Sequence, residues 1–127
     1  MTNKLFCPYE LSLLAKDKGF NEPCFGFYYT KDKELYLDDD DDEHGKAWED
    51  ILKAPLYSQI TDWLREEHKL HIGVDSMGLG YVGYHNNTHD PETWNKDKRW
   101  NTEPMKTYNE ALTKALESAL NLIPDKK

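Results

Sequence analysis

Long apolar runs are missing from this sequence of 127 residues. No stretch approaches the ~20 consecutive apolar residues that a membrane-spanning helix needs. The first residues, Met-Thr-Asn-Lys-Leu-Phe-Cys-Pro, also lack the apolar segment of a secretory signal peptide. We therefore expect a cytoplasmic protein that does not act at a membrane.

Cysteine is scarce, with Cys7 and Cys24 as the only two in the chain. Neither stands in a Cys-x-x-Cys pair, and neither has a histidine within a few residues. A single disulfide between them stays open as an alternative, but an intracellular chain with a core of its own favours buried free thiols. Nothing in their surroundings points to redox chemistry or to a cysteine nucleophile.

The motifs that mark common active sites are missing as well. The sequence has no His-Glu-x-x-His, no Gly-x-Ser-x-Gly and no Walker motif. Gly78, Gly80 and Gly83 do have the spacing of a dinucleotide-binding loop, but that loop must follow a strand and open a helix. Here residues 81–84 have the composition of a strand, so we expect a hairpin turn before them and no bound cofactor.

Positive charge is in short supply, because 16 Lys and Arg stand against 24 Asp and Glu and leave a net charge of −8. Six of those acids form the unbroken run 38–43, so the rest of the chain carries only −2. Binding to phosphate backbones or to acidic membranes needs clustered Lys and Arg. The charge distribution therefore disfavours nucleic acid and membranes as partners.

The acidic run also raises the alternative of a calcium site. Four acids fall at positions 1, 3, 5 and 12 of a calcium-loop count, namely Asp38, Asp40, Asp42 and Glu49. Glu43 stands where such a loop needs glycine for its sharp turn, and a strand rather than a helix is expected before it. We therefore expect a solvated acidic loop at 38–43 with no bound metal.

Periodicity places three helices and two hairpins along the chain. The sequence predicts helices over 8–18, from Pro55 to His68, and from Thr107 to Ile123. It predicts strands over 24–29, 34–37, 70–74 and 81–85, with a further short strand or turn around 51–52. The resulting fold class is α+β: a single compact domain over 1–127, of order α-β-β-α-β-β-α, with a mainly antiparallel sheet packed against helices.

Local signals support the ends and faces of these helices. Gly19 is placed to take a left-handed conformation after the first helix, with Phe20 folding back in a Schellman ending. Thr107 and Glu110 match a capping box at the start of the third helix. Trp63 lies on the apolar face of the second helix, so we expect it to be buried.

The histidines are candidate metal ligands. His85 and His89 have ligand-like spacing, and His68 and His71 flank the junction between the second helix and the strand after it. A zinc site needs three or four converging ligands, which a loop does not align. A metal-dependent enzyme would need a pocket that gathers His71, His85 or His89 with carboxylates, and we rank that alternative third.

A long polar loop at 86–104 is the best candidate for an interaction site, because loops of this length in small domains are often functional. It contains Trp94, Trp100 and Arg99, residue types that are enriched at binding hot spots. Two other interpretations stay open. The tryptophans pin the loop to the core, or they form a stacking platform for bases together with Tyr81 and Tyr84.

Several segments together resemble a family of small uncharacterised proteins that are encoded by phages, prophages and mobile elements of gut Bacteroidales. The resemblance rests on Gly-Phe-Asn-Glu-Pro-Cys (19–24), Ala-Pro-Leu-Tyr (54–57), Asp-Trp-Leu-Arg-Glu-Glu-His (62–68) and Tyr-Asn-Glu-Ala-Leu (108–112). These are caps, turns and core aromatics, so the resemblance implies a genomic setting and brings no catalytic motif.

The sequence thus favours a non-enzymatic accessory protein of a phage or mobile element, which acts by binding a host or phage protein through Trp94, Trp100 and Arg99. The first alternative is an acidic DNA mimic that inhibits a host nucleic-acid enzyme. The acidic balance supports it, but mimicry needs carboxylates spread over a broad surface. The second alternative is the metal-dependent enzyme that uses the histidines.

Overall fold

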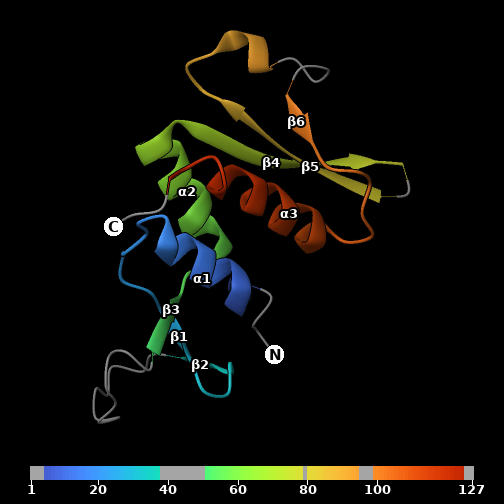
Figure 1. Ribbon diagram of the computed structural model, residues 1–127. Coiled ribbons are helices and arrows are strands. Elements are labelled where there is room, and N and C mark those ends of the chain that lie inside the picture. Colours follow the sequence, from blue (N-terminus) through green and yellow to red (C-terminus); the bar gives the residue numbers. More distant parts are fainter. Residues whose placement is uncertain (1–4, 38–50, 79, 95–98, 125–127) are drawn as a thin grey trace. The chain divides into compact units, whose positions relative to one another are not determined.

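The computed structural model describes residues 5–37, 51–78, 80–94 and 99–124 of the chain (Figure 1). They group into two compact units, the first extending to Ile60 and the second beginning at Thr61. The elements are α1 (Tyr9–Asp17), β1 (Gly26–Tyr29), β2 (Leu35–Leu37), β3 (Ile51–Ala54), α2 (Tyr57–His68), β4 (Leu70–Met77), β5 (Gly80–Asn87), the 3-10 helix η3 (Pro91–Trp94), β6 (Trp100–Asn101) and α3 (Tyr108–Leu120).

The first unit is built on an antiparallel sheet of order β2-β1-β3, against which α1 packs through β3. Its core contains Phe6, Tyr28, Leu52 and Ala54. The Tyr28 hydroxyl donates a hydrogen bond of 2.6 Å to the backbone oxygen of Cys7, which satisfies the one polar group that this aromatic brings into the core.

The end of α1 has the Schellman geometry that the sequence predicts. Gly19 has φ of 106°, a conformation that glycine adopts without the steric cost of a Cβ atom. The amides of Phe20 and Gly19 donate to the carbonyls of Ala15 and Lys16, both at 3.0 Å. These are the two hydrogen bonds of the motif, and Phe20 itself is buried.

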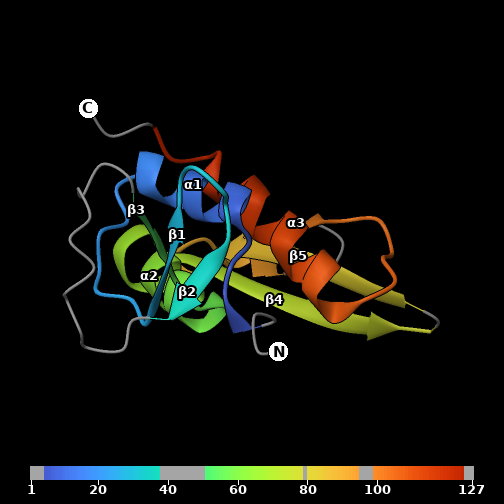
Figure 2. The same cartoon turned by 90° about the horizontal axis from the view of Figure 1, so that it is seen from below.

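The second unit is an antiparallel sheet of order β4-β5-β6, and α3 lies across one face of β4 and β5 (Figure 2). The predicted capping box is present: Thr107 Oγ1 accepts from the Glu110 amide at 3.1 Å, and the Glu110 side chain accepts from the Thr107 amide at 3.2 Å. The buried residues of α3 are all apolar, namely Ala111, Leu112, Ala115, Leu116, Ala119 and Leu120.

A close contact between α3 and β5 depends on a glycine. A Cβ atom at Gly83 would overlap the backbone oxygen of Ala111 and lie 3.1 Å from the Ala115 Cβ. The helix therefore rests directly on the β5 backbone at this point. The glycine spacing at 78–83 serves a hairpin and a close helix approach, because Gly80 and Gly83 lie within the strand β5.

The α+β class and the order of the predicted elements are confirmed; β3 lies where a short strand or turn is expected around 51–52, and β6 is an additional short strand. The strands form two separate three-stranded sheets instead of one. In the first sheet β1 lies between β2 and β3, and in the second β5 lies between β4 and β6. The burial predicted for Trp63 is also confirmed, and its ring meets His68 edge-on at 4.8 Å between centroids.

Two further expectations concern the loops and the membrane. The polar segment 86–104 is more structured than predicted, because β5 extends into it and it contains η3 and β6. The acidic run 38–43 and the proposed calcium-loop positions up to Glu49 lie outside the described residues. Within the described part of the chain, no helix combines the length and the apolar character that crossing a membrane requires.

Candidate functional site

Two exposed indoles lie at the β6 side of the second unit. Trp94 is 57% exposed at the end of η3, and its Nε1 donates a hydrogen bond of 3.0 Å to the backbone oxygen of Asn87. The η3 turn itself is held by Thr93 Oγ1, which donates to the Asp90 oxygen at 2.7 Å. The Trp94 ring is therefore fixed in direction although most of it faces solvent.

Trp100 is held by a different contact. Its ring stacks on the imidazole of His85, with 4.8 Å between ring centroids and 8° between the planes. His85 Nε2 in turn lies 3.0 Å from Ser118 Oγ on α3, so the stack is supported from the helix. Trp100 keeps 39% of its surface exposed. Neither indole is buried, yet each one holds the segment 86–104 to β5, so the interpretation that the tryptophans pin this loop stays open beside that of an interface.

The two indoles are anchored close together. Their anchor points on β5, His85 and Asn87, are two residues apart, which corresponds to about 7 Å along a strand. We call the pair Trp94 and Trp100 the tryptophan surface. Such exposed aromatic side chains with fixed orientation are typical of protein-binding hot spots.

Arg99 does not belong to the tryptophan surface. Its guanidinium lies 3.6 Å from the centroid of the Tyr84 ring, and its Nη2 donates to Asp75 Oδ2 at 2.6 Å. Its Nε donates to Asn101 Oδ1 at 2.9 Å, and only 9% of the side chain is exposed. Because Trp100 pairs with His85 in the β5–β6 ladder and Tyr84 is the next residue along β5, Arg99 and Trp100 serve opposite faces of the sheet.

Arg99 is therefore a structural residue of the second unit, and the expectation that it offers its charge to a partner is corrected. The same geometry weakens the stacking platform for bases. Tyr84 is covered by Arg99, while Tyr81 meets Tyr108 of α3 edge-on, with 6.2 Å between centroids. Tyr84 lies on the face opposite Trp100, and Tyr81 packs against Tyr108, so these rings do not form one open stacking face with the tryptophans.

The histidines are separated by the pleat of the sheet. His71 pairs with Asn86 and His85 pairs with Ile72, so the two imidazoles lie on opposite faces. The His89 amide donates to Asn87 Oδ1 at 2.8 Å in the exposed turn after β5. Among the described residues, no group of three or more His, Cys, Asp or Glu side chains is placed to hold a metal ion.

The pair of His85 and Ser118 has the distance of a base and its nucleophile, but its surroundings differ from those of an active site. Burial alone lowers the pKa of His85, and none of the described carboxylates hydrogen-bonds its ring. A catalytic pair needs a third group that orients the base and an open position for substrate. Here Trp100 covers the imidazole face, so the pair is a packed contact between β5 and α3.

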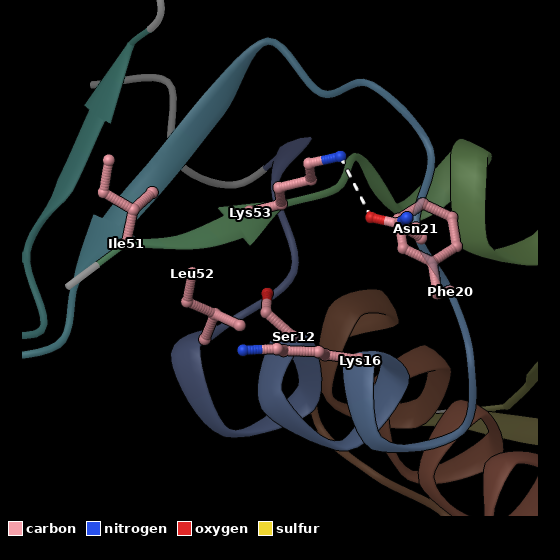
Figure 3. Close-up of a pocket in the computed structure, with 7 residues that line it drawn as sticks. All are labelled: Ser12, Lys16, Phe20, Asn21, Ile51, Leu52 and Lys53. Atoms are coloured by element: carbon pink, nitrogen blue, oxygen red, sulfur yellow. Dashed lines mark hydrogen bonds between the residues drawn. The ribbon is translucent and has the colours of Figure 1, made fainter. Parts of the chain in front are cut away.

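The described part of the first unit contains a small pocket between α1, β3 and the chain after α1 (Figure 3). Apolar atoms of Phe20, Ile51 and Leu52 line it, with Ser12 and Lys16 contributed by α1. At one side, Lys53 Nζ donates to Asn21 Oδ1 at 3.2 Å. The Ser12 hydroxyl is directed at the Cys7 oxygen, 3.3 Å away.

The size of this pocket limits what it can hold. Its volume is about 180 Å³, against roughly 300–1,000 Å³ for sites that bind drug-sized ligands and cofactors. It matches a single small molecule with an apolar body and one anionic group, which the ammonium groups of Lys16 and Lys53 would attract. Among the described residues that line it there is no carboxylate or histidine, so these residues form no acid–base pair for catalysis.

Both cysteines are free, as the sequence analysis favours, and neither is an activated thiol. Cys7 is fully buried, and burial raises the pKa of its thiol far above the ordinary range. Burial also raises the pKa of Cys24 to about 11, against a smaller lowering by the Lys53 charge. Both shifts favour the protonated thiol, so the surroundings of the cysteines give no support to a thiolate nucleophile.

Comparison with known proteins adds no identification: no family model, no curated protein and no solved structure matches this chain. The site is therefore judged on its geometry alone. Sequence reasoning found the two tryptophans, but it missed the His85–Trp100 stack and the role of Ser118. The alternation of Tyr81, Gly83 and His85 on one parity of β5 was the available signal for a helix-facing histidine.

Proposed function

We propose that this protein acts by binding another protein, and that the tryptophan surface on its second unit is the centre of the interface. The observation that carries the proposal is that both indoles are exposed and yet held, Trp94 by Asn87 and Trp100 by His85. Because their orientation is fixed on folding, little side-chain freedom is lost on binding. Aromatic anchors of this kind dominate the energy of protein interfaces.

The surroundings of the tryptophan surface favour a protein over a nucleic acid. Asp90 and Glu92 are exposed on either side of Pro91, at the start of η3. These acids would repel a phosphate backbone and would suit a partner with basic residues at the rim of its interface. Arg99, the nearest described cation in sequence, is already bound to Asp75.

The resemblance to proteins of phages and mobile elements gives the proposal its biological setting. On that resemblance, the partner is a host or phage protein and the chain is an accessory factor without catalysis of its own. The alternative of an acidic DNA mimic depends on the run 38–43, which lies outside the described residues. The described geometry provides no reason to prefer it, and the separated histidines provide none for a metal enzyme.

The test is partner capture by matched variants. The tagged protein is purified from host cells that carry the phage or element, the partner is identified by mass spectrometry, and its affinity is measured with purified components. We expect Trp94→Ala or Trp100→Ala to weaken binding by about thirtyfold or more. Trp94→Ala should change the free energy of unfolding by only about 1 kcal/mol, since the indole is largely outside the core.

Two exposed apolar residues that are not part of the tryptophan surface provide the controls. Leu122 is 63% exposed in the second unit and Phe25 is 67% exposed in the first, so alanine at these positions removes a comparable apolar surface. Both controls should bind like the parent protein. The proposal is wrong if the tryptophan variants bind as well as the controls, or if a folded tryptophan variant loses a measurable enzymatic activity instead.

A further inference from the structure

The strand β4 forms one edge of the second sheet. It pairs with β5 over eight successive residues without a bulge, and none of the other described strands pairs with it. An edge strand presents a row of unpaired backbone groups that another strand can join. Proteins usually protect such edges with lysine, proline or a bulge, and residues 70–77 contain none of these.

The hydrogen bonds of the sheet show which residues of β4 face outward. The Thr88 amide donates to the Lys69 oxygen, so these two opposite residues form a hydrogen-bonded pair. Because hydrogen-bonded and non-hydrogen-bonded pairs alternate along an antiparallel ladder, the backbone amides and carbonyls of His71, Gly73 and Asp75 also point toward β5. The Thr102 amide donates to the Gly83 oxygen, so Gly83 directs its backbone groups away from β4, which agrees with this alternation. The outward-facing amides and carbonyls of β4 are therefore those of Leu70, Ile72, Val74 and Ser76.

The sequence of this edge is complementary to itself in the antiparallel direction. With Gly73 opposite Gly73 of a second copy, His71 lies opposite Asp75 and Ile72 lies opposite Val74, and each of these pairs occurs twice. Arg99 occupies Oδ2 of Asp75, and the Asp75 side chain is still 34% exposed. Its Oδ1 has no hydrogen bond among the described residues, so it can accept one from an opposing histidine.

We propose that β4 pairs with β4 of a second copy of this chain around a two-fold axis at Gly73, joining two second units into one continuous six-stranded sheet. Such pairing gains hydrogen bonds from the outward groups and covers Val74, which is only partly buried in the single chain. The helix α3 packs on one face of β4 and β5, whereas a second strand would join β4 at its edge, in the plane of the sheet.

The first test is the mass of the protein in solution, measured by sedimentation over a range of concentrations. We expect a reversible dimer. Val74→Pro removes an amide that faces the second copy while leaving the β4–β5 hydrogen bonds intact, so it should abolish the dimer in a folded monomer. Val74→Ile keeps the amide and should keep the dimer. A parent protein that stays monomeric, or a folded Val74→Pro that still dimerises, overturns the proposal.

The register is tested through charge, which does not depend on whether the proline variant folds. His71→Lys places a permanent cation opposite Asp75 of the second copy and should strengthen the dimer, whereas His71→Glu should weaken it. With two such pairs in each dimer, we expect the two Kd values to differ by about tenfold or more. Kd values that are equal, or ordered the other way, contradict this register.

Discussion

Two Arg–Asp ion pairs in the second unit have similar lengths and different surroundings. Arg99 and Asp75 are joined at 2.6 Å, with the arginine side chain 9% exposed, and Arg65 and Asp62 are joined at 2.7 Å with both side chains largely in solvent. An exposed pair is screened by water and contributes little. In the partly buried pair, the Arg99 guanidinium also contacts the Tyr84 ring and Asn101. Removing the arginine therefore breaks these contacts and leaves the Asp75 carboxylate without its ion-pair partner.

We therefore expect Arg99→Ala to lower the free energy of unfolding by about 1.5–3 kcal/mol, the usual range for hydrogen bonds to charged groups. Arg99→Lys should lower the free energy of unfolding by a smaller amount than Arg99→Ala, because lysine keeps the charge but loses the planar stack on Tyr84. Arg65→Ala is the matched control and should cost no more than about 1 kcal/mol. Urea unfolding measures all three. If Arg99→Ala and Arg65→Ala lower the free energy of unfolding equally, the partly buried surroundings of Arg99 do not strengthen its ion pair.

At the scale of elements, the contact of α3 with β5 is the most sensitive to side-chain size. The helix backbone at Ala111 sits where a Cβ atom of residue 83 would lie, and a backbone atom cannot move aside without moving the helix. Gly73 is a contrasting case. The atoms near it belong to the far end of the Tyr84 side chain, which can rotate.

Gly83→Ala should therefore destabilise the protein by about 1–3 kcal/mol, as other overpacked sites do. Gly73→Ala should cost less, because only the Tyr84 ring and the Arg99 stacked on it must shift. Thermal unfolding of both variants checks the difference. A Gly83→Ala protein as stable as its parent would mean that α3 is not seated on the β5 backbone as described.

At the scale of the whole molecule, two partly buried histidines link stability to pH. Burial lowers the pKa of His85, and burial with the nearby Arg65 charge lowers the pKa of His71, from an ordinary value of 6.5. Below pH 6.5, these two histidines are therefore protonated to a greater extent in the unfolded chain than in the folded chain. The contribution to stability is complete above that pH and is lost as the pH falls through the lowered pKa values.

We expect the free energy of unfolding to fall as the pH is lowered from just above to below 6.5. His85→Asn should reduce this slope, even if the variant is less stable at every pH because Trp100 loses its stacking partner. His71→Asn should reduce it further when combined. Urea unfolding at a series of pH values measures the slope, and a slope unchanged in the double variant would contradict the burial of both imidazoles.

Features that depend only on neighbours in the chain could be predicted from the sequence alone. The Schellman ending of α1 needs only Gly19 and an apolar residue after it, and the capping box of α3 needs only Thr107 and Glu110. The alternation that begins at Leu70 identified β4 for the same reason. In the candidate site, the sequence pointed to Trp94 and Trp100, because a large apolar side chain in a polar loop has a packing or a binding role.

Features that depend on pairing between distant segments became visible only in the folded structure. The register of β6 against β5 put Trp100 on His85 and turned Arg99 to the opposite face, a choice that a shift of one residue would reverse. The division into two sheets and the closeness of Gly83 to α3 arise in the same way, from strand order and helix seating. These contacts join residues that are far apart in sequence, so the periodicity within one segment cannot predict them.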